Sequence, residues 1–381
     1  MTAYKALTWD HPRGYNALAA AAAALDPERD GLSIEWEKQP LEGFESHPIA
    51  DLCARYDLVV LDHPHVGEAV GGDCLVPLEE VFGSDAIAAL AEASIGPSMT
   101  SYRYAGHHWA LPLDAATQVM ARRADILADA PVTWDDVRAL SKDTGKVALS
   151  LAGPHAALSF LSIASALGEP PATKDPEQLV SSDIGAAVYD LMAELASRSP
   201  ESVAGKNPIG ILAHMAAHDD VALCPLIYGY VNYAAPATGQ PIDFSDAPRE
   251  TVTGRPGSTL GGTGIGISRR CKVTPELKRH LLWLMSEEAQ AGFIPDHDGQ
   301  PSRRSAWHDR RVNARWGDFY SNTAATLEAA YVRPRHHGYI AFQTKASSLL
   351  REAFAERRTA VPTLEALQAL YAQSRVPGAE R

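Results

Sequence analysis

The sequence has few cysteines, no long apolar run and a shortage of basic residues. Its four cysteines, Cys53, Cys74, Cys224 and Cys271, contain no C-x-x-C pair. This spacing argues against a disulfide framework or a zinc ribbon and favours small buried thiols. No apolar stretch reaches the length of a transmembrane helix. The chain has 34 Lys and Arg but 47 Asp and Glu, so its net charge is -13. This charge disfavours binding to nucleic acids or to anionic membranes.

The composition that remains is that of an ordinary soluble globular protein. Hydrophobic residues make up 46% and charged residues 21% of the 381 residues, a length that suits two lobes better than one core. Residues 1–7 lack the basic region and apolar core of a leader, which predicts a cytoplasmic chain as the sequence stands. A periplasmic or extracellular location is the alternative if a leader has been removed.

Apolar patterns in the first 62 residues alternate between strand and helix. Residues 4–7, 32–37 and 57–61 have the patterns of strands, and residues 17–25 and 49–55 those of helices. Residues 58–61 of the last strand are all apolar, as expected for a strand covered on both faces. This order predicts a parallel α/β sheet.

Polar and aromatic side chains gather where two of these strands end. The turn at residues 8–16 holds Trp9, Asp10, His11, Arg13 and Tyr15, and the third strand is followed by Asp62, His63 and His65. In open α/β sheets, ligands bind at the carboxyl ends of the strands. We therefore interpret the turn as one wall of a small-molecule site. The H-x-H pair has metal-ligand residue types, but with an intervening proline and no third ligand at a set spacing we predict no metal.

Five motifs follow one another in an order that resembles a known family. They are Asp57-Leu58-Val59-Val60-Leu61-Asp62 with Leu75-Val76-Pro77-Leu78, Tyr104 to Pro112, Thr133-Trp134-Asp135-Asp136-Val137, Gly261 to Ser268, and Glu287 to Gln290 with Gln300 to Arg303. In this order they resemble the substrate-binding proteins of ABC importers, in particular the group that includes carbohydrate binders. Thr133 to Val137 also has the spacing of a helix-capping box. The glycines at 261–266 lack the spacing of a nucleotide fingerprint and fit close backbone passage at a hinge.

The resemblance implies a two-lobe, periplasmic-binding-protein-like α/β fold with a ligand cleft between the lobes. The first lobe would comprise residues 1–112 with a return segment at 259–306. The second would comprise residues 113–258 with the carboxyl-terminal helices at 307–381. Ligand binding would close the lobes by a hinge motion. Members of the family are normally secreted, and the apparent lack of a leader is the one departure.

With this fold, loops from both lobes are expected to converge on the cleft. Asp114 follows the crossover, Arg333 and His337 lie on a late loop with Arg335, and Asn16 is a possible cap for the first helix. The predicted ligand-binding residues are Trp9, Asp10, His11, Arg13, Tyr15, Asp62, His63, Asp114, Tyr228, Tyr230, Asn232, Thr263, Arg303 and Arg335. Aromatic faces suit a sugar ring, and arginines suit an acidic group. The alternative for each arginine is an ion pair with a surface carboxylate.

The sequence therefore predicts a solute-binding protein without catalysis, cofactor or metal. It would be a monomer that captures a sugar, polyol or carboxylate and passes it to an ABC permease, with no nucleic-acid partner. The alternative is a cytosolic enzyme or sensor on the same fold, with Asp10, His11 and His63 as acid–base groups.

Overall fold

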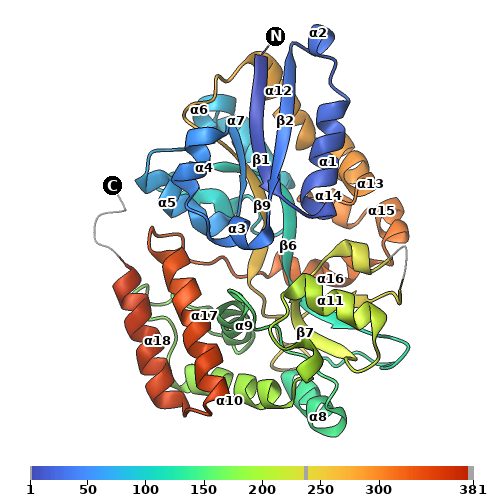
Figure 1. Cartoon of the computed structure of the whole chain (residues 1–381), viewed down its shortest axis with the longest axis vertical. Coiled ribbons are helices and arrows are strands. Elements are labelled where there is room, and N and C mark those ends of the chain that lie inside the picture. The colour runs from blue at the N-terminus through green and yellow to red at the C-terminus, as the bar shows by residue number, and fades with distance from the viewer. Residues whose placement is uncertain (1, 236–238, 376–381) are drawn as a thin grey trace.

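The chain folds into two α/β lobes, one above the other in Figure 1, as predicted from the sequence. The computed structural model describes residues 2–235 and 239–375. No helix in these ranges is long and apolar enough to cross a membrane.

A largely parallel sheet forms the centre of the first lobe. Strand β1 (Thr2–Trp9) pairs in parallel with β2 (Leu32–Gln39) and β3 (Leu58–Leu61). All four residues of β3 are buried, which explains its unbroken apolar sequence. Strand β9 (Leu260–Ile267) returns antiparallel beside β3 and also pairs with β6 (Ala110–Arg122).

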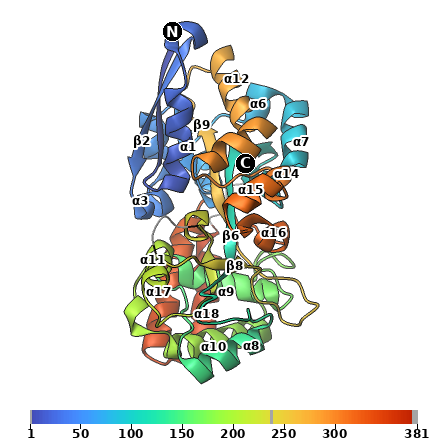
Figure 2. The ribbon, with the colours of Figure 1, turned by 90° about the vertical axis from the view of Figure 1, so that its right-hand side faces the viewer.

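Helices cover the sheet of the first lobe on both sides (Figures 1 and 2). They are α1 (Pro12–Ala23), α2 (Pro27–Asp30), α3 (Leu41–Ser46), α4 (Ile49–Arg55), α5 (Val66–Gly71), α6 (Leu78–Phe82), α7 (Ser84–Ala93), α12 (Pro275–Leu284), α13 (Ile294–Asp296), α14 (Arg304–Trp307) and α15 (Arg310–Arg315). The small hairpin of β4 (Arg103–Tyr104) and β5 (His107–His108) precedes β6.

The long strand β6 connects the two lobes (Figure 2). Its first half pairs with β9 as far as Thr117 opposite Leu260, and its second half pairs with β7 (Leu223–Tyr228) and β8 (Asp243–Ser245). The glycine-rich segment at residues 261–266 lies on β9 at this junction between the lobes. Gly262 has a φ of +91°, and a Cβ there would lie 2.4 Å from the Asp114 carbonyl oxygen. The close backbone passage predicted for these glycines is therefore present.

Helices make up most of the second lobe. They are α8 (Trp134–Thr144), α9 (His155–Ala166), α10 (Ser182–Arg198), α11 (Pro208–Ala217), α17 (Tyr339–Ala355) and α18 (Ala360–Ser374), with α16 (Phe319–Glu328) packed on β6 and β8 at the junction. The predicted capping box is present, since the Thr133 side chain accepts from the Asp136 backbone N–H and Asp136 accepts from that of Thr133. An apolar cluster that includes Phe160, Tyr189 and Tyr371 holds α9, α10, α17 and α18 together.

Two local predictions differ from the structure. Helix α1 begins at Pro12, so most of the predicted turn is already helical, and its cap is His11; Asn16 instead donates to Asp298. The apolar pattern of residues 275–293 predicts one helix, but α12 stops at Leu284 and a π-helical turn follows from Ala289. The lobe boundary at 306 stays a prediction, although α15 beyond it makes ion pairs with Asp296 of the return segment.

Candidate functional site

A cavity lies between the lobes, at the carboxyl ends of strands β1, β2, β3 and β7. Its volume is about 60 Å³. For comparison, a cavity of about 150 Å³ accommodates benzene, so the lobes in this structure are too close together to hold a six-carbon sugar. Sixteen residues line it: Trp9, Arg13, Leu41, Phe44, Glu45, Asp62, Pro154, His155, Leu158, Tyr228, Tyr230, Gly261, Gly262, Thr263, Arg333 and Gln343.

Arg13 joins both lobes at the base of the cavity. Its Nε and Nη2 atoms donate to the two carboxylate oxygens of Asp114 at 2.7 and 2.5 Å, and Nη1 donates to the Gly229 carbonyl at 3.1 Å. The guanidinium also lies 5.0 Å from the ring centroid of Tyr230. Burial alone would lower the pKa of Arg13, but the adjoining Asp114 carboxylate raises it. The arginine is thus a fully paired cation.

Aromatic rings form one wall of the cavity. Trp9 is the last residue of β1, and its indole stacks on the His11 ring at 5.1 Å and meets Phe44 and Tyr230 at 5.9 and 6.1 Å. The indole lies directly over Gly14, where a Cβ would be 2.2 Å from Nε1. Glycine is therefore required at this position in α1 for Trp9 to reach the cavity.

His11 supports this wall from outside the cavity lining. Its Nδ1 accepts from the Arg13 backbone N–H at 3.1 Å and caps α1. Burial, followed by the charge of Arg13, lowers the pKa of His11 to about 4. The ring is therefore neutral at neutral pH, as its acceptor role requires.

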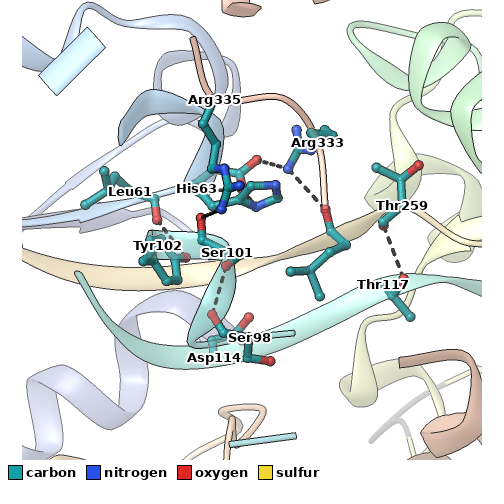
Figure 3. A network of polar contacts seen from close by, with 12 residues as sticks. Leu61, His63, Ser98, Ser101, Tyr102, Asp114, Thr117, Thr259, Arg333 and Arg335 are labelled. Atoms are coloured by element: carbon teal, nitrogen blue, oxygen red, sulfur yellow. Dashed lines mark hydrogen bonds and ion pairs between the residues drawn. The ribbon is translucent and has the colours of Figure 1, made fainter. Parts of the chain in front are cut away.

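Asp62 and Arg333 form a second ion pair across the lobes. Figure 3 shows Arg333 beside His63, the residue that follows Asp62. Arg333 Nη2 donates to Asp62 at 2.5 Å and to the Leu260 carbonyl at 3.2 Å, and Nη1 donates to Gln343 at 3.0 Å. Burial would raise the pKa of Asp62, but the Arg333 guanidinium and His63 hold it well below its usual range. This arginine, like Arg13, is charged and already neutralised.

Glu45 and His155 face each other across the cavity without a hydrogen bond. The His155 Nε2 atom lies 3.6 Å from a Glu45 carboxylate oxygen, and neither ring nitrogen of His155 has a hydrogen-bond partner among the described residues. Burial, together with Arg333 and Arg351, lowers the pKa of His155 to about 3. Burial and the nearby Asp62 raise the pKa of Glu45 to about 8.

Several polar atoms of the lining are buried and unpaired. Besides the His155 ring, they include the Thr263 hydroxyl and Nε of Arg333. Thr263, His155 and Arg333 are each at most 3% exposed. Buried polar groups are rarely left without partners in proteins, so their gathering around one cavity marks it as a binding site.

Six of the fourteen residues predicted to bind a ligand line this cavity, namely Trp9, Arg13, Asp62, Tyr228, Tyr230 and Thr263. Two more lie directly behind it, since Asp114 pairs with Arg13 and His11 caps α1. Arg333 also lines it, as the sequence indicated for the late loop that carries it.

The other predicted residues lie outside the cavity lining. Asp10 is 59% exposed and pairs with Lys38, whose ammonium also covers the Tyr15 ring. Arg303 pairs with Glu287 on the surface, and Asn232 lies in the turn after β7.

His63 and Arg335 support the site from behind (Figure 3). His63 is fully buried, its Nδ1 lies 3.1 Å from Asp62, and its pKa is lowered to about 4 by burial and then by Arg333. Arg335 donates to the Thr100 and Ser101 carbonyls. Within the described ranges, no three His, Cys, Asp or Glu side chains group as metal ligands.

The lining residues on α3, at the start of α9 and on α17 were not predicted from the sequence. Leu41, Phe44 and Glu45 follow β2 directly, so the strand-end rule that singled out Trp9 applies equally to them. Pro154, His155, Leu158 and Gln343 gave no signal of their own, because they reach the cavity only through the packing of α9 against α17.

Comparison with known proteins identifies the family. A family model described as bacterial extracellular solute-binding protein matches residues 20–312, more than half of the chain. No curated protein sequence matches.

Solved structures share the whole fold at low sequence identity. A solute-binding protein of an ABC transporter from Agrobacterium radiobacter, in complex with ribitol, is 20% identical, covers 98% of both chains and has a TM-score of 0.79. Maltose-bound MalE3 of T. maritima is 16% identical over 97% of this chain and 99% of its own, with a TM-score of 0.80. A mannitol-bound solute-binding protein from Agrobacterium vitis is 14% identical over 98% of both chains, with a TM-score of 0.76. The chain belongs to the family of bacterial extracellular solute-binding proteins.

Proposed function

We propose that the cavity binds a small polyhydroxylated molecule, a sugar or a polyol, and that the lobes separate to admit it and close over it. The observation that carries the proposal is the set of buried, unpaired polar groups on Thr263, His155 and Arg333 beside the aromatic wall. An unpaired buried donor or acceptor costs about 1–3 kcal/mol. Ligand hydroxyls both donate and accept, so they suit all three groups.

The aromatic wall supports the same ligand class. Trp9, Phe44, Tyr228 and Tyr230 line the cavity and offer apolar ring faces to the C–H groups of a sugar or polyol. The structural relatives described above were solved with ribitol, maltose and mannitol, which agrees with this choice.

Charge argues against the acidic ligand that the sequence also allowed. Arg13 and Arg333 each face a carboxylate at 2.5 Å, so neither offers an uncompensated charge to an anion. Glu45, the acid of the lining that has no cationic partner, adds no positive charge for an anion and would repel one when ionised. A carboxylate or phosphate is therefore the less favoured ligand.

The proposed role is capture without chemistry. The acid–base groups of the enzyme alternative do not meet: Asp10 is on the surface, His63 is fully buried behind Asp62, and His11 caps α1. In keeping with the family description, we place the protein outside the cytoplasm, as a monomer that delivers its ligand to an ABC permease.

A thermal-shift screen over sugars, polyols, carboxylates and phosphates tests the ligand class. A ligand at about 100 times its Kd adds about 2.7 kcal/mol to the free energy of unfolding. We expect sugars or polyols to give the shift, and a hit among carboxylates or phosphates alone would contradict the proposal.

Thr263→Val then tests the cavity itself. This substitution keeps the shape of the side chain and removes only an unpaired hydroxyl, so affinity should fall about tenfold, the equivalent of one hydrogen bond, while the unliganded Tm does not fall. Thr251→Val, in an exposed loop away from the cavity, is the matched control and should leave affinity unchanged.

A further inference from the structure

Glu45 is the one acidic residue of the cavity lining that lacks a cationic partner. It lies on α3, directly after β2, with its side chain 23% exposed. The other acid of the lining, Asp62, is paired with Arg333 at 2.5 Å. No described side chain donates a hydrogen bond to Glu45, and its nearest basic group is the His155 ring at 3.6 Å.

None of the basic groups around Glu45 can neutralise it. His155 is uncharged at neutral pH, because its pKa lies at about 3. Arg333 acts on Glu45 from a distance, but its own charge is matched by Asp62. Asp62 and Glu42, the remaining charged neighbours, add negative charge. The first turn of α9, where His155 begins the helix, contributes only a partial positive charge.

The lining is therefore short of one positive charge when the lobes are closed. A carboxylate removed from water without a partner is strongly unfavourable. In agreement with this, the pKa of Glu45 is raised to about 8, so the closed, empty site holds a proton that it would give up to a cation.

We propose that the ligand supplies this charge: the site selects a polyhydroxylated molecule that carries a protonated amine, an amino sugar or an aminopolyol, with the ammonium group on Glu45. The hydroxyls of such a ligand would face Thr263, His155 and Arg333 on the other sides of the cavity. This inference rests on the proposed function, since it adds the ammonium group to the same ligand class.

Isothermal titration calorimetry with matched probes tests the inference. The probes are glucosamine, glucose and N-acetylglucosamine, and 1-amino-1-deoxysorbitol with sorbitol. We expect each free amine to bind about tenfold to a hundredfold more tightly than its neutral counterparts, the range of a charged hydrogen bond. At pH 7 amine binding should also release a proton, measured by titration in two buffers of different ionisation enthalpy, because the ammonium lowers the pKa of Glu45 from about 8.

Glu45→Gln should abolish both the amine preference and the proton release, so that each free amine binds the variant no more tightly than its neutral counterparts do. Glu42→Gln is the matched control, since Glu42 is an exposed acid on the same helix, and it should keep both the amine preference and the proton release. Circular dichroism and the unliganded Tm verify that both variants are folded.

The outcomes separate the two proposals. Equal affinities for amines and neutral polyols, or an amine preference that survives Glu45→Gln, would overturn the inference and leave the polyol-binding function standing. If no sugar, polyol or amine probe binds while an acid from the thermal-shift screen does, both proposals fail.

Discussion

Removing Arg13 should destabilise the empty protein, although the residue lines a ligand cavity. Its guanidinium makes a bidentate pair with Asp114 at 2.7 and 2.5 Å, and the side chains are only 4% and 5% exposed. In Arg13→Met the Asp114 carboxylate would stay buried on β6 without its partner. Arg13 also bonds Gly229 at the end of β7, so the substitution removes a contact between the lobes as well.

The loss expected for breaking one side of a buried ion pair is about 3–5 kcal/mol. The double variant Arg13→Met with Asp114→Leu removes both charges and substitutes apolar groups, which is often close to neutral. We therefore expect the double variant to be more stable than Arg13→Met alone. The exposed pair of Arg29 and Asp30, in which Arg29 is 68% exposed, is the control, and Arg29→Met should cost less than about 1 kcal/mol.

Urea unfolding without ligand measures these differences, with tryptophan fluorescence and circular dichroism followed together. A loss below about 1 kcal/mol for Arg13→Met would place the pair in the range of exposed salt bridges and refute the reasoning. The reasoning would also be refuted if the free energy of unfolding fell in the double variant by as much as the sum of its losses in Arg13→Met and in Asp114→Leu. Arg13 would then be a ligand-binding residue with no structural role, as the sequence alone suggested.

Three further predictions concern the described contacts. Glu45→Gln should stabilise the unliganded protein by roughly 1–3 kcal/mol at pH 8.5 and not at pH 4. The reason is that the pKa of Glu45 is raised to about 8 in the folded protein, so the wild type loses stability as the pH rises above the pKa of the unfolded chain. The Tm of both proteins measured against pH tests this, and a Tm difference that does not change with pH would contradict it. Gly262→Ala should lower the free energy of unfolding in urea by more than about 1 kcal/mol, because φ is +91° and the new Cβ would clash with the Asp114 carbonyl. An unchanged urea midpoint would show that the backbone at this junction can move to accept the side chain. Thr133→Ala should cost about 1 kcal/mol by the same assay through loss of the capping box, and it should leave ligand affinity untouched.

The elements of the fold were predictable where periodicity is local. Helix α4 has the predicted limits, and strands β1, β2 and β3 appear where alternating or unbroken apolar runs indicated them. The break after Leu284 was not predicted, because the apolar pattern of residues 275–293 continues across it.

The direction of side chains decided which residues of the first turn line the cavity. Successive residues of a strand point to opposite sides, so Trp9 at the end of β1 faces the cavity while Asp10 faces Lys38 outside. Arg13 and Tyr15 are two positions apart on α1 and therefore lie on different faces of the helix. The sequence gives these periods, but the start of α1 at Pro12 had to be known before they could be applied.

Contacts between distant segments were beyond the reach of the sequence. Arg335 donates to the carbonyls of residues 100 and 101, and His155 on α9 lies 3.6 Å from Glu45 on α3, more than 100 residues earlier in the chain. Arg303, predicted to bind the ligand, forms an ion pair with Glu287. An ion pair with a surface carboxylate was the alternative prediction for each arginine.

Charged side chains that form ion pairs within the protein affect ligand choice differently from those that have no partner. The sequence allowed an acidic ligand because several arginines lie on loops near the cleft, but a paired arginine presents a nearly neutral dipole to its surroundings. Arg13 with Asp114 and Arg333 with Asp62 each cancel, so what the cavity offers electrostatically is the group left over. That group is Glu45, whose nearest basic neighbour is a neutral histidine. In a site of this kind the selectivity follows from the one charge that the protein leaves unpaired, and its sign is opposite to the one that the arginines suggested.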